Sequence, residues 1–107
     1  RAHPVLLAFG QGLTVKGWAI DISVESVAGG VIIDIDGLTY QAFYGAERSD
    51  VSMALARPTC RYCGFKCEIP ATALASGEHV LSLRILTNDQ KSYYKTGEIR
   101  FRLEGGR

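Results

Sequence analysis

The chain has 107 residues, 47% of them hydrophobic and 21% charged, and its formal net charge is +1. This length suits one domain with a sizeable core, and the composition excludes a disordered chain. The near-neutral balance lacks the basic excess that nucleic acid or an anionic membrane would attract, so no nucleic-acid partner is expected. The apolar run at residues 5–9 is too short to span a bilayer, so no membrane insertion by this segment is expected.

The first predicted strand covers residues 13–21. Val15 and Trp18 both suit burial, yet a separation of three residues puts them on opposite faces of a regular strand. An extra residue would reset the alternation, and glycine tolerates such a position. We therefore expect a β-bulge at Gly17 and a place for Trp18 in the core.

A β-hairpin is predicted next. Residues 31–36 carry an apolar side chain at every second position, and residues 38–44 form the return strand. Between them, Asp36-Gly37 is a dipeptide that favours a two-residue turn. Asp34 and Asp36 also resemble the start of a calcium loop, but the later oxygen ligands of such a loop are absent, so the turn is favoured.

The long connection at residues 45–62 interrupts this rhythm of short strands. Ser49 suits the N-cap of a short helical turn near residues 49–56, which a following proline would end. Val51 and Leu55 are four residues apart, so both are expected to face the sandwich.

The remaining strands are predicted at residues 63–69, 78–86 and 93–104. In the last of them, alternation puts Tyr93 inward and Tyr94 outward. The expected core consists of the apolar residues on the inward faces of these strands and of the hairpin: Val31, Ile33, Ile35, Phe65, Ile69, Leu81, Leu83, Ile85, Ile99, Phe101 and Leu103. In the same pattern, Cys63 and Cys67 share a face with Phe65, and His79 points inward.

About seven strands joined mostly by turns exclude a parallel α/β fold, which needs crossover helices. The sequence predicts an all-β fold, a two-sheet antiparallel β-sandwich of immunoglobulin-like type. We expect an N-terminal extension at residues 1–12, the sandwich at residues 13–104 and a C-terminal tail at residues 105–107. The chain reads as a module of a longer polypeptide, and its compartment, cytoplasm or cell envelope, would follow that parent protein.

A series of short motifs runs in order through nearly the whole chain. They are Gly17-Trp18-Ala19-x-Asp21, Asp36-Gly37, Tyr44-Gly45-x-x-Arg48-x-Asp50-Val51, Gly64-Phe65, Ile69-Pro70, Leu74-x-x-Gly77-x-His79 and Leu81-x-Leu83-Arg84. This order resembles the small immunoglobulin-like β-sandwich modules appended to bacterial glycosyltransferases, sugar-modifying methyltransferases and related cell-envelope proteins. The resemblance implies an accessory, non-catalytic domain. The three cysteines do not belong to that pattern.

The thiols follow the spacing Cys60-x2-Cys63-x3-Cys67. A structural zinc site would need a fourth ligand, for which His3 and His79 are available, and His79 is the one expected to point inward. A redox pair of Cys60 and Cys63 would need a helix N-terminus after a strand, whereas Cys63 leads into a strand. Buried, inert thiols are therefore favoured, and Cys60 could form a disulfide in an oxidising compartment. No cofactor and no metal are expected; Cys60, Cys63, Cys67 and His79 are the only ligand set that a metal could use.

No catalytic constellation is present, so we do not expect an enzyme. The acidic residues lie on open sheet faces, and no serine stands in a nucleophile elbow. Binding is the expected role, through aromatic and charged residues that border the long connection: Tyr44, Arg48, Asp50, Tyr62 and Tyr94. Such residues suit weak binding of carbohydrate, and they also suit docking onto a neighbouring domain of the parent polypeptide.

Overall fold

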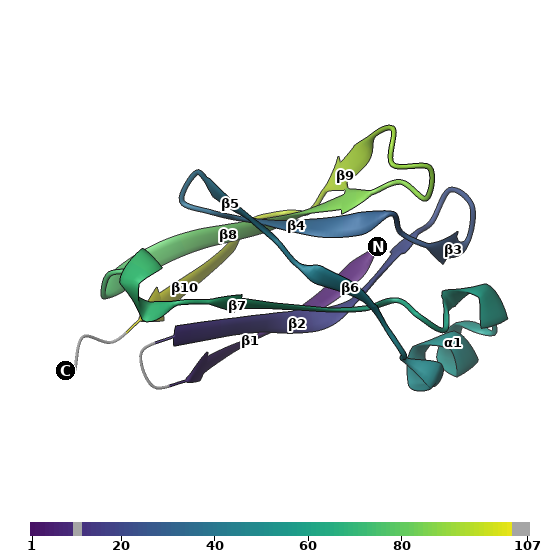
Figure 1. The fold of residues 1–107 in the computed structure, drawn as a ribbon, viewed down its shortest axis with the longest axis horizontal. Helices are drawn as coiled ribbons and strands as arrows, with labels where there is room; N and C mark the ends of the chain where they lie inside the picture. Colours follow the sequence, from purple (N-terminus) through teal and green to yellow (C-terminus); the bar gives the residue numbers. More distant parts are fainter. Residues whose placement is uncertain (10–11, 104–107) are drawn as a thin grey trace.

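The computed structural model describes residues 1–9 and 12–103, which form two antiparallel five-stranded sheets packed as a β-sandwich (Figure 1). The first sheet has the order β1-β2-β7-β6, with β3 added to β2, and the second has the order β10-β8-β4-β5, with β9 added to β8. The strands are β1 (Ala2–Phe9), β2 (Gly12–Asp21), β3 (Ser26–Val27), β4 (Gly30–Ile35), β5 (Leu38–Gln41), β6 (Phe43–Ala46), β7 (Gly64–Ile69), β8 (Gly77–Leu86), β9 (Tyr93–Lys95) and β10 (Ile99–Leu103). The predicted two-sheet antiparallel sandwich is confirmed, although the described residues form ten strands and not about seven.

The first strand lies in the segment where we expected an extension, residues 1–12. Ala2–Phe9 forms β1 and pairs with β2 along its whole length, from Ala2 opposite Ala19 to Phe9 opposite Gly12. Val5 and Leu7 are apolar although they lie on the outer face. The segment therefore lacks the alternation of polar and apolar residues by which the other strands were predicted. The expected tail at residues 105–107 lies outside the described residues.

The expected bulge at Gly17 is wrong, because β2 stays in register with both neighbours across this residue. Gly17 is needed for a different reason: a Cβ there would overlap the carbonyl oxygen of His3 on β1. Without a bulge, Val15 faces the second sheet and Trp18 lies on the opposite face of β2. Trp18 is partly exposed and packs against a separate cluster, not in the core between the sheets.

The predicted hairpin turn is confirmed, but the return strand ends at Gln41 and does not extend to Tyr44. Asp36 and Gly37 connect β4 to β5, and their φ angles of 51° and 87° are the positive pair that a tight turn of this kind requires. The chain then passes directly from β5 in the second sheet to β6 in the first. The Ala42 N–H donates to the Val31 carbonyl at 3.0 Å, and the next residue, Phe43, already pairs with Lys66 of β7.

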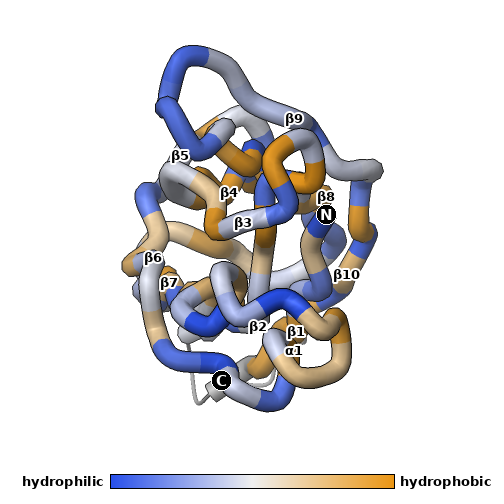
Figure 2. Tube along the Cα trace, turned by 90° about the vertical axis from the view of Figure 1, so that its right-hand side faces the viewer, coloured by the Kyte–Doolittle hydropathy of each residue, from blue (hydrophilic) through white to orange (hydrophobic). Residues whose placement is uncertain are grey.

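Two groups of buried side chains stabilise the molecule. The main core lies between the sheets: Leu13, Val15, Ala19, Ala28, Val31, Ile33, Ile35, Ala42, Phe65, Cys67, Ile69, Leu81, Leu83 and Ile85. The end cluster lies beside the helix: Ile20, Val51, Cys60 and Cys63. In Figure 2, which looks along the sandwich from this end, hydrophobic segments lie between the layers and hydrophilic ones follow the loop before β9.

Most of the predicted core is confirmed. Every member from Val31 to Ile85 is buried, whereas Ile99, Phe101 and Leu103 on the edge strand β10 are only partly buried. Ile99 and Phe101 still pack against the main core. The partial exposure follows from the position of β10 at the end of its sheet, where no further strand covers it.

The short helix is confirmed as α1 (Ser49–Leu55), but its N-cap is Arg48, and no side chain caps it. Ser49 is therefore the first helical residue and not the cap. Val51 is buried and Leu55 is partly buried against the end cluster, as expected. Two 3-10 turns, η1 (Pro58–Cys60) and η2 (Ala71–Ala73), complete the structure. In the described part of the chain, no helix has the length and apolar character to cross a membrane.

Candidate functional site

Tyr44 of β6 has a structural role that occupies its hydroxyl. This group donates to the Ala19 carbonyl at 2.6 Å and accepts from the Ala28 N–H at 2.8 Å. Burial raises the pKa of the Tyr44 phenol well above its usual range. The ring contacts both the main core and the end cluster. Tyr44 therefore links β6 to β2 and to the connection between β3 and β4, and its polar atom is engaged within the fold.

Arg48 and Asp50 form an ion pair at the start of α1. The Arg48 Nε and Nη2 donate to the two carboxylate oxygens of Asp50 at 3.0 and 2.9 Å. The hydrogen bond from Arg48 lowers the pKa of Asp50. The Arg48 stem passes over Gly64, where a Cβ would lie 3.1 Å from the Arg48 Cγ. Arg48 therefore ties the start of α1 to strand β7.

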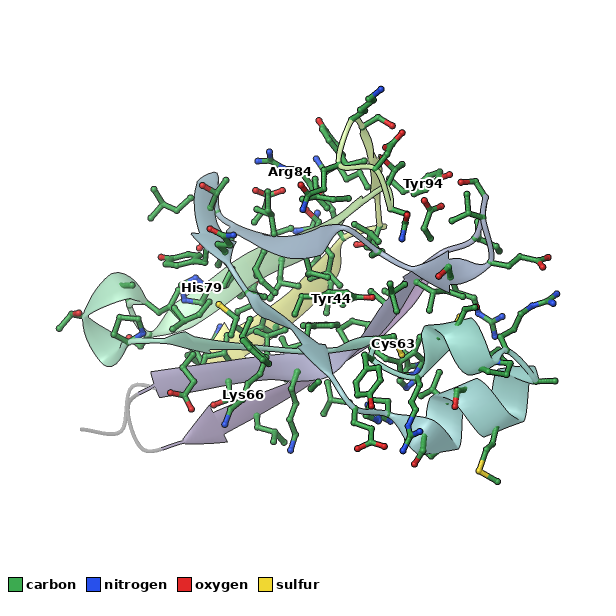
Figure 3. The ribbon with its side chains drawn as sticks, turned by 45° about the vertical axis from the view of Figure 1, so that its right-hand side comes forward. Tyr44, Cys63, Lys66, His79, Arg84 and Tyr94 are labelled. Atoms are coloured by element: carbon green, nitrogen blue, oxygen red, sulfur yellow. The ribbon has the colours of Figure 1, made fainter. Side chains whose placement is uncertain are left out.

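Tyr62 and Tyr94 are both exposed, but they belong to different parts of the fold. Tyr62 follows η1 in the long connection, with the Arg61 guanidinium 5.6 Å from its ring centroid. Tyr94 lies on β9 opposite Ile85, so it points to the inner side of the second sheet. Figure 3 shows Tyr94 at the top of the sandwich, in the second sheet, whereas α1 lies beside the first sheet. The five predicted residues therefore do not form one surface: Tyr44, Arg48, Asp50 and Tyr62 border the long connection, and Tyr94 does not.

The orientation expected for the two neighbouring tyrosines of β9 is reversed. Tyr93, not Tyr94, lies on the outer face of the second sheet. The cause is one extra residue between β9 and β10, because there are five steps from Tyr94 to Ile99 but four from Ile85 to Leu81 on β8. Such an extra residue exchanges the two faces of a strand.

Thr96 holds this irregular stretch in place. Its backbone N–H donates to the Leu83 carbonyl, and its Oγ1 accepts from the Leu83 N–H, both at 2.9 Å. The side-chain oxygen takes the place of a backbone carbonyl, so the ladder stays satisfied while the strand shifts its register. A threonine beside Gly97 was the only sequence signal of this bulge.

The outer face of the second sheet carries the strongest candidate site. The sheet-2 face consists of Asp34, Asp36, Ser82, Arg84, Tyr93, Lys95, Glu98 and Arg100 around an open depression of about 600 Å³. Arg84 donates from Nε and Nη2 to the two carboxylate oxygens of Asp34 at 2.9 and 2.7 Å. The Arg84 guanidinium also lies 5.5 Å from the ring centroid of Tyr93. An arginine, a carboxylate and an exposed aromatic ring are thereby held in one fixed arrangement.

The four potential metal ligands do not come together. Cys60 and Cys63 lie in the end cluster, Cys67 lies in the main core, and Figure 3 shows His79 at the opposite end of the sandwich from Cys63. Burial raises the pKa of both Cys63 and Cys67, which disfavours the thiolate that a metal or a disulfide exchange would use. Within residues 1–9 and 12–103, no group of three or more His, Cys, Asp and Glu side chains could hold a metal ion.

His79 has a structural environment instead. Its Nδ1 lies 2.5 Å from Asp36 Oδ2, and its Nε2 lies 2.7 Å from the Ala75 carbonyl oxygen. Both neighbours can accept, so the doubly protonated imidazolium is the form that donates to both of them. The hydrogen bond to Asp36 raises the pKa of His79, and the same bond lowers the pKa of Asp36. The pair joins the β4–β5 turn to β8.

No protein-family model, no curated protein and no solved structure matches the chain.

Proposed function

We propose that this chain is a non-catalytic binding module that holds carbohydrate weakly on the sheet-2 face, as an accessory part of a larger bacterial glycan-processing or cell-envelope protein. The observation that carries the proposal is the exposed ring of Tyr93 beside the fixed Arg84–Asp34 pair in an open depression. A sugar ring presents C–H groups on one side and hydroxyls at its edge. It can therefore pack on the tyrosine and hydrogen bond with the charged pair at the same time.

The charges of the sheet-2 face favour a neutral saccharide. Three cations (Arg84, Lys95 and Arg100) stand among three carboxylates (Asp34, Asp36 and Glu98) around the depression. A polyanion would meet as many repulsive groups as attractive ones. Sugar hydroxyls, in contrast, both donate and accept hydrogen bonds, so they can use groups of either sign.

The Arg84–Asp34 pair is organised before any ligand binds. Asp34 uses one N–H on Nε and one on Nη2, and a guanidinium has five donors in a fixed fork. The remaining donors are held in the depression without further ordering of the side chain. Less conformational entropy is then lost when a ligand binds, which matters for a shallow site with few contacts.

The test is a titration followed by NMR chemical shifts, with neutral and uronic-acid-containing envelope saccharides. The working concentration should reach about 50 mM, because a weak site with a dissociation constant of about 1 mM binds with only about 4 kcal/mol. We expect shifts confined to β4, β8 and β9 with the neutral saccharides. Absence of any shift with every saccharide would refute the proposal.

A matched pair of variants locates the site. Tyr93 and Tyr62 are each 53% exposed, and each has a guanidinium near its ring, at 5.5 and 5.6 Å. Tyr62 differs because it lies in the long connection, outside the depression. We expect Tyr93→Ala to abolish the shifts and Tyr62→Ala to leave them unchanged. Loss of binding in Tyr62→Ala alone would place the site on the long connection instead.

Docking onto a neighbouring domain is the second candidate function. The side chain of Met53 on α1 is 78% exposed, and it lies on a groove beside Ala56 and Pro58. An exposed methionine on such a groove suits an apolar contact with another protein surface. Mixing the chain with the separately purified remainder of its parent polypeptide tests this role. Met53→Ser should weaken any complex about tenfold if the groove is the contact.

A further inference from the structure

The outer face of the first sheet differs from the sheet-2 face in both charge and polarity. The sheet-1 face consists of Val5, Leu7, Lys16, Phe43, Lys66 and Glu68. Four of these residues form one line across the sheet, since Val5 lies opposite Lys16, Lys16 opposite Lys66, and Lys66 opposite Phe43. Figure 3 shows Lys66 on the far side of the sandwich from Arg84, so the two faces point in opposite directions.

Two lysines stand directly opposite each other in this line. Like charges in this position destabilise a pair of strands. Glu68 lies 3.3 Å from Lys66 and offsets part of the repulsion. Lys16 has no ion pair within the described ranges 1–9 and 12–103. Arg48 contributes a third cation at the border of this face, although Asp50 neutralises much of its charge. The face therefore keeps a local positive charge in a chain whose net charge is only +1.

Apolar side chains flank the two lysines. Val5, Leu7 and Phe43 are 42%, 40% and 67% exposed, although they occupy positions where a solvent-facing strand normally carries polar residues. Between the lysines and Arg48 is a depression of about 490 Å³, and Gly17 and Gly64 are among the residues that line it. Apolar groups on both sides of a positive centre are complementary to a segment with carboxylates between apolar residues.

We propose that the sheet-1 face docks an acidic segment of a partner protein, whose carboxylates contact Lys16 and Lys66 while its apolar side chains cover Val5 and Phe43. An anionic membrane fits less well, because lipid recognition by basic residues uses about four to eight Lys and Arg. An acidic glycan could stack on the ring of Phe43, but the aliphatic side chains of Val5 and Leu7 suit the apolar residues of a protein segment better than a sugar ring. This inference is independent of carbohydrate binding, which concerns the opposite face.

The experiment uses the whole chain and a short peptide, blocked at both ends, that carries two glutamates between leucines. Its control is the same peptide with glutamine in place of glutamate. NMR titration at low salt should give shifts on β1, β2 and β7 with the acidic peptide, with a dissociation constant of about 1 mM, and about tenfold weaker binding with the control. Raising the salt concentration to about 0.5 M should weaken the binding of the acidic peptide, because exposed charges are then screened.

Charge-reversal variants test the residues. The double substitution Lys16→Glu and Lys66→Glu should abolish binding of the acidic peptide. Lys95→Glu on the sheet-2 face should leave binding of this peptide unchanged. If the double glutamate variant fails to fold, Lys16→Met with Lys66→Met serves in its place and should lose binding as well.

Three results would overturn the proposal. The first is equal affinity for the acidic and glutamine peptides. The second is an equal loss in Lys95→Glu, which would point to a general charge effect. The third is binding of anionic lipid vesicles or of polygalacturonate through Lys16 and Lys66 without binding of the acidic peptide, which would assign the face to a membrane or a glycan.

Discussion

The main core and the end cluster are built in different ways. Strand alternation alone produces the main core, because inward residues of the two sheets meet face to face. The end cluster exists because the long connection folds back over the outer face of β2, where Val51 and the two thiols of Cys60 and Cys63 cover Ile20. The end of β2 is consequently buried on both faces, at Ala19 on one and Ile20 on the other. A segment that reads as a loop thereby supplies a second site of hydrophobic packing.

Truncation of one residue in each group should separate them most clearly. Leu83 is fully buried in the main core, so Leu83→Ala should lower the free energy of unfolding by about 2–5 kcal/mol. Val51→Ala in the end cluster should cost only about 1–2 kcal/mol, because it removes two methyl groups at one end of the molecule. Urea denaturation measures both changes. A cost for Val51→Ala as large as that for Leu83→Ala would contradict the distinction between the two groups.

Tyr44→Phe tests the link between the two groups, since the Tyr44 ring contacts both. Removing the hydroxyl leaves the Ala28 N–H and the Ala19 carbonyl without their partner, which should cost about 1 kcal/mol. Hydrogen exchange should show faster exchange at Ala28 in the variant. A change below about 0.3 kcal/mol would show that water replaces the hydroxyl and that the ring alone provides the link.

The smallest expected effect is a pH dependence that comes from His79, which lies outside the end cluster. The pKa of His79 is raised in the folded state by its bonds to Asp36 and Ala75, so its stabilisation is complete below the unfolded value of about 6.5 and is lost as the pH rises through the folded value. The advantage of the wild type over His79→Gln should therefore shrink between pH 5.5 and pH 8. Asp36 stays ionised over this range, because its pKa is lowered.

Urea titrations of both proteins at the two pH values measure this effect. Both proteins contain the same three thiols, so thiol ionisation cancels in the comparison. The ring centroids of His79 and Phe101 lie 5.4 Å apart. The pH-dependent change in stability should therefore affect β8 and β10 and not α1. A constant difference between the two proteins would show that His79 does not titrate with a raised pKa.

The sequence was sufficient for features that depend on local pattern. Alternation predicted the buried faces of β4, β7 and β8, and Asp36-Gly37 predicted the hairpin turn, because these follow from the period of a strand and the φ angles of a turn. The helix and the Arg48–Asp50 pair were predictable for the same reason. Ser49 was misplaced by one residue as the cap, since the carbonyl that starts the helix belongs to Arg48.

Features that depend on register were not predictable. One extra residue between β9 and β10 exchanged Tyr93 for Tyr94 on the outer face, and with it the content of the candidate site. Trp18 was misassigned because burial by a loop on the outer face cannot be distinguished from burial by a second sheet. Strand β1 was missed because Val5 and Leu7 are apolar although exposed, which removes the alternation that marks a strand.

The connection from β5 to β6 joins the two sheets covalently at one edge of the sandwich. At this edge the two sheets are joined by the peptide bonds on either side of Ala42, within a single extended run and without a loop. At the other edge, β1 and β10 end their respective sheets, and only side chains such as Leu6 and Phe101 hold them against the core. The other crossings between the sheets, from β3 to β4 and from β7 to β8, also join the layers covalently, whereas the β1–β10 edge is held by side-chain packing. We therefore expect any separation of the layers, by force or by thermal fluctuation, to start at the β1–β10 edge.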